Sequence, residues 1–273
     1  MPDAPILTDR NALGLHRARA ARNPALFLHD EAAAEIEERL SEVNKSYNAP
    51  LLVGHVTPPL RALFPDAPVI DDTDRLPIAR EAHDLVIHTF GLHWADDPVG
   101  QLVQSRLALQ PDGLFLGIMF GGATLQELRA ALAEAESQLT GGLSPRVLPM
   151  ADIRDLGGLL QRAGLALPVA DSAKLTVRYP DLATLIRDLR GMGETNALAT
   201  RHKAIPPRRL FEETERLYRR HFSDESHLTA TFELVFLTGW APDASQPQPL
   251  RPGSAQSRLA EALGVPETPL KRD

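Results

Sequence analysis

Short apolar segments alternate with amphipathic segments between residues 50 and 139, and this alternation limits the chain to few folds. Residues 84–89 and 114–120 are continuous apolar runs, which are typical of strands buried on both faces of a sheet. A strand pattern that is repeatedly followed by a helix pattern favours βαβ units and a parallel sheet. The sequence therefore predicts an α/β fold. The expected strands span 50–54, 67–71, 84–89 and 113–119, and the expected helices span 58–64, 98–109 and 124–139.

The flanking segments complete the predicted architecture. Residues 8–22 are polar and basic with few apolar anchors, which suggests either an N-terminal arm lying on the body or, as the simpler interpretation, a solvated helix. Apolar positions recur at helical spacing from Phe27 to Val43, so we expect a helix that covers the sheet. Thr124 and Glu127 have the spacing of a capping box. Further helices are expected at 152–163, 180–190, 208–221 and 254–263, and further strands at 174–179 and 231–239. The predicted domains are 1–48, the arm and covering helix, 49–241, the α/β domain, and 242–273, a Pro-rich C-terminal extension.

Composition excludes several classes of function. The 273 residues are 43% hydrophobic, which suffices for a sizeable core. The net charge is -7, so no positive field favours nucleic acid or an anionic membrane, and we expect a small molecule or a protein as partner. The chain has no cysteine, which excludes disulfides, thiolate metal sites and a thiol nucleophile. No apolar run approaches the roughly 20 residues that span a bilayer, and the N-terminus has no apolar signal segment, so we expect no membrane insertion and a cytoplasmic location.

Residues 51–60 read as a core strand that runs directly into a short helix. In open α/β sheets this junction is where a nucleotide-like ligand binds, and free backbone N–H groups there hold its phosphate or carboxylate. Here a single glycine, Gly54, is followed by His55, and Pro58 and Pro59 carry no N–H. The fold pattern and the ligand pattern of this junction therefore disagree.

Six sequence blocks carry a resemblance to a known family. They are residues 88–98, 107–117, 121–129, 154–164, 187–198 and 230–242, among which Met192-Gly-Glu-Thr-Asn-Ala197 and Phe236-Leu-Thr-Gly-Trp240 are the most specific. The chain resembles the class I S-adenosylmethionine (SAM)-dependent methyltransferase family, in the branch of the mitochondrial complex I assembly factors. It is more distantly similar to the malonyl-carrier-protein methyltransferases of biotin synthesis. The resemblance covers nearly the whole chain.

This resemblance implies a Rossmann-like, mostly parallel sheet with an antiparallel last strand and SAM at the ends of its first, second and fourth strands. A complete member has three βα units before the fourth strand, at about 30 residues each, but only 34 positions separate Leu51 from Leu85. One βα unit is therefore expected to be missing. Loss of the third strand would disturb the sheet least, because this strand lies at the edge of the sheet in the family. Residues 68–71 would then be the second strand, and Asp71 or Asp72 would be the acid that binds the SAM ribose. In the alternative alignment, residues 72–77 match the later acidic stretch beside the adenine.

The resemblance and the strand ends together give the candidate site residues. Cofactor contacts are expected from Gly54, His55, Asp71, Asp72, His88 and Phe90, and substrate contacts from His93, Trp94, Gly121, Gly122, Glu194 and Asn196. No metal site is expected, because no third ligand of matching spacing accompanies His88 and His93. Methyl transfer from SAM depends mainly on holding donor and acceptor in line, so no catalytic acid or base is assigned.

Two functions follow from these patterns. The first is a SAM-dependent methyltransferase that acts on a protein or carrier-bound substrate, similar to the assembly factors. The second is a pseudo-methyltransferase that has lost its cofactor pocket and serves as a binding or assembly module. The short interval between 51 and 85 and the Pro58-Pro59 junction motivate the second. The sequence does not indicate the acceptor or the oligomeric state.

Overall fold

Side chains alternate between the two faces of the central strands and so build two hydrophobic cores around one sheet. The computed structural model describes residues 6–43, 45–224 and 226–247. Leu52 and Ile87 pack into one core, whereas Leu51 and Val86, their neighbours on the same strands, pack into the other. Strands that are buried on both faces have this period of two, which explains the continuous apolar runs of the sequence.

The strands form one sheet in the order β2-β1-β3-β4-β7-β5, and the short β6 pairs with β7. Strands β1 to β4 are parallel to one another, and β7 is antiparallel to β4 and to β5. This arrangement confirms the predicted Rossmann-like sheet with an antiparallel last strand. The bounds are β1 Pro50–Gly54, β2 Val69–Ile70, β3 His83–Thr89, β4 Leu109–Phe120, β5 Ala166–Tyr179, β6 Ser223–Asp224 and β7 His227–Trp240.

One βα unit is missing between β1 and β3. Within the described chain, only the helix α3 (Pro58–Leu63) and the two-residue β2 lie between these strands. Val69 and Ile70 of β2 pair with β1, so β2 occupies the edge position beside β1. The structure thus confirms that residues 68–71 hold the second strand and that the outer third strand of the family is the one lost.

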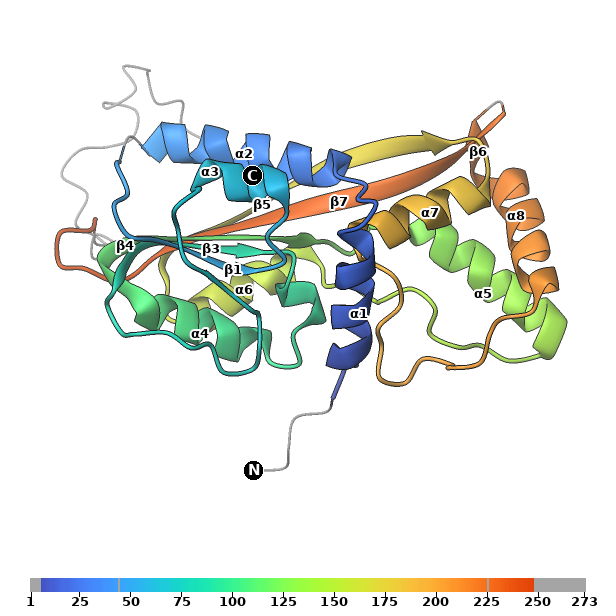
Figure 1. Cartoon of the computed structure of the whole chain (residues 1–273), viewed down its shortest axis with the longest axis horizontal. Coiled ribbons are helices and arrows are strands. Elements are labelled where there is room, and N and C mark those ends of the chain that lie inside the picture. The colour runs from blue at the N-terminus through green and yellow to red at the C-terminus, as the bar shows by residue number, and fades with distance from the viewer. Residues whose placement is uncertain (1–5, 44, 225, 248–273) are drawn as a thin grey trace, which may run out of the picture. The chain divides into compact units, whose positions relative to one another are not determined.

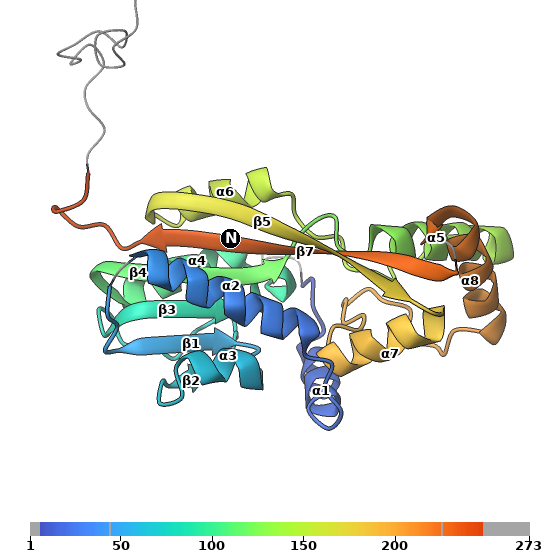
Figure 2. The same ribbon diagram turned by 90° about the horizontal axis from the view of Figure 1, so that it is seen from above.

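Helices cover both faces of the sheet and one end of it (Figures 1 and 2). Helices α2 and α3 pack in the core of Leu52, whereas α4 and α6 pack in the core of Leu51. Helices α5, α7 and α8 gather at the end of β5 and β7 where β6 lies. The remaining bounds are α1 Arg10–Ala20, α2 Phe27–Val43, η1 (a 3-10 helix) Leu92–Trp94, α4 Pro98–Ala108, α5 Gln126–Thr140, α6 Ile153–Arg162, α7 Leu182–Met192 and α8 Arg208–Phe222.

Two local predictions were wrong. Strands β5 and β7 are much longer than expected, because they pair with each other along their whole lengths. The capping box at α5 does not form, and the helix begins at Gln126 after Leu125, whose φ is 54°. The Thr124 hydroxyl instead donates to the Glu233 carbonyl, and the Glu127 carboxylate accepts from the Thr231 N–H. The helix expected at 254–263 lies outside the described residues.

Candidate functional site

The carboxyl ends of β1 and β3 meet at Gly54 and Thr89, which are partners in the parallel register. Gly54 has a φ of 96°, and a Cβ added to it would lie 2.5 Å from the Thr89 carbonyl oxygen. The glycine therefore serves the close approach of the two strands. The next N–H, that of His55, donates to the same carbonyl at 2.9 Å, so it is not free for a ligand.

The rest of the β1–α3 junction also offers few donors. The Val56 N–H donates to the Gly54 carbonyl, and Pro58 and Pro59 have no N–H. Helix α3 is only 6 residues long. This junction consequently lacks the row of free N–H groups with which such turns hold phosphate or carboxylate.

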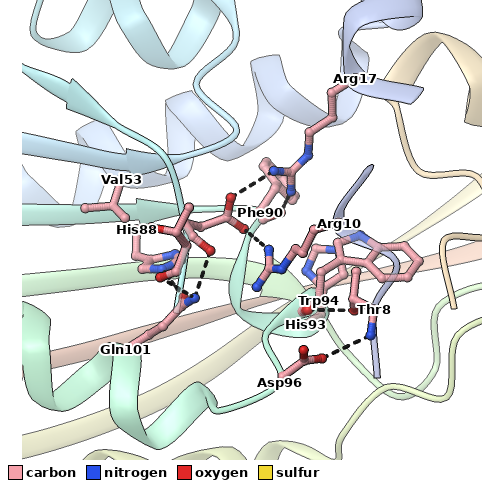
Figure 3. Close-up of polar contacts among 12 residues, drawn as sticks. Thr8, Arg10, Arg17, Val53, His88, Phe90, His93, Trp94, Asp96 and Gln101 are labelled. Atoms are coloured by element: carbon pink, nitrogen blue, oxygen red, sulfur yellow. Dashed lines mark hydrogen bonds and ion pairs between the residues drawn. The ribbon is translucent and has the colours of Figure 1, made fainter. Parts of the chain in front are cut away.

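Asp72 is the charged centre of this edge of the sheet, and its partners Arg10 and Arg17 are labelled in Figure 3. Its carboxylate accepts from Arg17 at 3.0 Å on Oδ1 and from Arg10 at 3.2 Å on Oδ2, and its side chain is only 7% exposed. Burial favours the neutral carboxyl, but the two arginines outweigh burial and lower the pKa of Asp72. Arg17 also donates to the Phe90 carbonyl at 2.8 Å. Asp71, the other candidate for the ribose contact, is exposed.

A buried chain of hydrogen bonds joins His88, through Gln101, to the backbone carbonyl of Asp72. The His88 Nε2 lies 2.8 Å from the Gln101 Oε1, and the Gln101 amide donates to the Asp72 carbonyl at 2.9 Å. His88 is fully buried, and burial lowers its pKa to about 4, so the imidazole is neutral. Gly91 lies against the Asp72 carboxylate, because a Cβ added to Gly91 would come within 2.5 Å of the Asp72 Oδ2.

An aromatic cluster fills the space beside the Asp72 ion pairs. The ring of Phe90 lies 4.7 Å from that of His29 and 5.0 Å from that of Phe120, and His55 contacts His29 edge-to-face. Burial lowers the pKa of both His29 and His55 to about 4. Phe90 has a φ of 43°, an unusual value for a residue with a side chain, and such strain concentrates at functional sites.

Glu194 forms a second buried centre, at η1. Its Oε2 accepts from the Trp94 indole N–H at 2.8 Å and lies 3.0 Å from the His93 Nε2. Burial alone would raise the pKa of Glu194, but His93, Arg17 and the indole N–H lower it to about 2. The other oxygen, Oε1, is buried and has no partner in the described parts of the chain.

A cavity of about 720 Å³ lies next to Glu194. Its lining comes from α1, α5 and α7 and from the segments around residues 146–150 and 194–206. Of the predicted substrate residues, Trp94, Glu194 and Asn196 line it. His93 lies behind Glu194, while Gly121 packs closely against Val235 of β7 and lies outside the lining described for the cavity, as does Gly122.

Helix α1 stands between the two centres. Arg10 and Arg17 face Asp72, whereas His16, Arg19 and Ala20 line the cavity. The helix is held by contacts to distant segments: the Thr8 hydroxyl donates to the Trp94 carbonyl, and Asp9 pairs with Arg201. The sequence indicated an arm on the body or a solvated helix here and assigned it no role in the site, so the contacts of Arg10 and Arg17 with Asp72 were missed; the basic residues of this segment were the available signal.

The cofactor expected from the resemblance does not fit the site in this arrangement. Both oxygens of Asp72, one of the two acids expected from the resemblance to bind the ribose hydroxyls, are paired with arginines, and the junction after β1 has no row of free N–H groups. No cluster of metal-binding side chains occurs among the described residues.

Comparison with known proteins finds relatives of two kinds. The chain is 38% identical to the human protein "Arginine-hydroxylase NDUFAF5, mitochondrial" over 72% of this chain and 57% of that one. It is 33% identical to the malonyl-[acyl-carrier protein] O-methyltransferase of Laribacter hongkongensis over 68% of this chain and 61% of that one. The chain thus spans less than two thirds of the length of these relatives. The expected cofactor class, SAM, agrees with the methyltransferase relatives.

A phosphoethanolamine N-methyltransferase 2 from Haemonchus contortus, solved in complex with SAM, has a TM-score of 0.42 and 11% identity over 80% of this chain and 53% of that one. No protein-family model matches the chain. In the part of the chain that the structure describes, no helix is long and apolar enough to cross a membrane.

Proposed function

Since this chain belongs to the class I SAM-dependent methyltransferase-like family that includes the NDUFAF5 arginine-hydroxylases and the malonyl-carrier-protein O-methyltransferases, we propose that it is a substrate-binding module of that family. It holds a protein or carrier-bound substrate in the cavity beside Glu194. Its cofactor position is closed by α1. The assembly role and the cytoplasmic location expected from the sequence are part of this proposal.

One observation carries the proposal, namely the double ion pair of Asp72 with Arg10 and Arg17. Displacing α1 from this carboxylate would leave a buried charge without its partners, a change that costs about 3–5 kcal/mol for a buried pair. A ribose diol can donate hydrogen bonds to the carboxylate, but it brings no positive charge, so it does not replace the two guanidinium groups that neutralise Asp72. The closed arrangement is therefore favoured over a bound cofactor.

The substrate side supports the same proposal, because it keeps an open cavity. A volume of about 720 Å³ is within the range of small-molecule sites. Glu194 and Trp94, which belong to the blocks that carry the family resemblance, line it and are bonded to each other. A protein that keeps the substrate cavity open while its cofactor position is closed is suited to binding a substrate.

A second candidate is a SAM-dependent transferase in which α1 withdraws from Asp72. The observation in its favour is that Gly54, Gly91 and Asp72 still stand together at the ends of β1 and β3, where the family resemblance expects the cofactor. The O-methyltransferase relatives favour it too. In that case Arg10 and Arg17 would have to leave the carboxylate before the cofactor enters.

Isothermal titration with SAM and with its demethylated product S-adenosylhomocysteine separates the two candidates. For the binding module we expect no saturable heat from either compound up to hundreds of micromolar. Saturable binding of either compound to the full chain would refute the closed cofactor position and support the transferase. Circular dichroism of the same sample checks that the protein is folded, so that an absent heat is informative.

A further inference from the structure

The cavity beside Glu194 is apolar inside. Six of its lining side chains come from α5, α7, α8 and β7 and present only hydrocarbon surface, namely Leu128, Leu132, Ile186, Leu189, Phe211 and Phe232. Apolar walls of this kind favour a ligand with a hydrocarbon body, since its burial removes both surfaces from water. Such walls offer nothing to a wholly polar ligand.

The mouth of the cavity is cationic. Arg19, Arg187, Arg190 and Lys203 line the cavity and are themselves exposed, which places them where it opens to solvent. Within the described residues, none of these four side chains makes an ion pair or a hydrogen bond. The chain as a whole carries a net charge of -7, so four unpaired cations at one opening are a local reversal of its charge.

Two other arginines of the lining are already neutralised, which sharpens the contrast. Arg146 is paired with Glu136, and Arg201 is paired with Asp9 at 2.9 Å. These two lining arginines are therefore neutralised by carboxylates of the protein itself. The four cations of the mouth make no direct ion pair with a described carboxylate, although Arg187 and Lys203 lower the pKa of Asp181 and Asp9, and a ligand that brings an acid would supply such a pair.

The inner end of the cavity sets the direction of such a ligand. Glu194 is the single acid of the lining, its side chain is only 6% exposed, and its Oε1 has no partner among the described groups. An anionic group that entered as far as Glu194 would meet a like charge in a buried setting. The acid of the ligand must therefore stay at the mouth, with its apolar part inside.

We propose that this cavity binds an amphipathic acid, with its hydrocarbon body among the side chains of α5 and α7 and its carboxylate or phosphate among Arg19, Arg187, Arg190 and Lys203. This inference rests on the proposed function in that the same cavity is the substrate site, and it names the chemical class of that substrate. Either a free amphiphile or an acidic group on the apolar stem of a larger molecule has this chemistry.

The test uses three probes with the same ten-carbon chain, namely decanoate, decanol and decyltrimethylammonium, each below its micelle concentration. Binding is measured by calorimetry and by the fluorescence of Trp94, which lines the cavity. Decanoate should bind at least tenfold more tightly than decanol, and the cationic probe should bind most weakly. Added salt should weaken decanoate and leave decanol unchanged, because salt screens exposed charges.

Variants locate the binding and distinguish the source of the acid. The double change Arg187→Gln and Arg190→Gln should weaken decanoate about tenfold without changing decanol, as expected for two partly exposed ionic contacts. The matched control, Arg75→Gln with Arg80→Gln, removes two exposed arginines outside the cavity and should change neither probe. Leu128→Trp, which fills the cavity, should abolish both. Decanoyl-pantetheine phosphate is tested as a competitor of decanoate. If it competes and binds at least tenfold more tightly than free decanoate, the acidic group of the natural ligand belongs to a larger molecule.

Equal binding of decanoate and decanol, or binding of neither, would overturn the inference. Its failure is distinguishable from failure of the proposed function, which is decided by the separate titration with SAM and S-adenosylhomocysteine. A protein that binds SAM and also prefers decanoate would retain this inference and lose the closed cofactor position. A protein that binds neither SAM nor decanoate would retain the closed cofactor position and lose this inference.

Discussion

Acid should destabilise this protein through its buried imidazoles before its carboxylates titrate. His29 of α2 and His88 of β3 are buried, and His55, which follows β1, is partly buried; burial lowers the pKa of each to about 4 from 6.5. In each case the folded state favours the neutral ring. The unfolded chain therefore takes up the proton first as the pH falls below 6.5, and stability is lost from there down to about pH 4.

The size of the effect follows from the shift. A difference of 2.5 (6.5 minus 4) in pKa corresponds to about 3 kcal/mol per imidazole once the pH lies below both values. At about pH 5 the loss is roughly 2 kcal/mol per imidazole, and because His29 and His55 are in contact, only the losses of His29 and His88 are added, to about 4 kcal/mol. That is a large share of the whole stability of many domains, at about 5–15 kcal/mol. The lowered pKa values of Asp72 and Glu194 act only below about pH 4.5, at the acid end of this window and below the pH 5 of the comparison.

The change His29→Leu isolates one of these contributions. His29 is 1% exposed, neither ring nitrogen has a partner in the described chain, and its ring lies on Phe90, so leucine removes a proton acceptor without breaking a hydrogen bond. Between about pH 7.5 and pH 5 the variant should lose about 2 kcal/mol less stability than the wild type. The measurement is urea unfolding followed by circular dichroism at both pH values. The exposed His202→Leu serves as control, and a pH dependence of His29→Leu equal to that of the wild type would refute the reasoning.

Three further changes test the site by denaturant unfolding. Asp72→Asn should destabilise the protein by about 3 kcal/mol, since it leaves two arginines without their carboxylate, and a loss near zero would show that the ion pairs are not formed. Trp94→Phe should cost about 1–3 kcal/mol, because it removes the donor to the buried Glu194 carboxylate, and an unchanged midpoint would contradict that bond. Gly54→Ala should cost more than about 1 kcal/mol because of its positive φ and its contact with the neighbouring strand, whereas Gly158→Ala, in a helix with open space around it, should be neutral or stabilising.

The central sheet was predictable because its signals are local. Apolar runs such as 84–89 and 114–120 report burial on both faces without reference to the rest of the chain, and the missing βα unit followed from counting the residues between Leu51 and Leu85. The position of β2 beside β1 then confirmed which strand was lost. Length and hydrophobicity were sufficient for these conclusions.

The site was less predictable because its contacts join distant segments. Arg10 and Arg17 reach Asp72 across 62 and 55 positions, and Trp94 reaches Glu194 across 100. A basic helix with few apolar anchors gives no local sign that two of its arginines turn toward a buried carboxylate. The choice between Asp71 and Asp72 was open for the same reason, since only the fold shows that Asp72 faces the arginines.

Because α1 is a wall shared by the Asp72 site and the cavity, the two are thermodynamically linked. Arg17 holds Asp72 on one side of the helix, and Arg19 and Ala20 form part of the cavity on another. A ligand that favours one position of α1 must change the affinity of the other site, and linkage requires the effect to be equal in both directions. A molecule that fills the cavity and holds α1 in place would therefore act as an antagonist of anything that competes for Asp72, without touching that carboxylate.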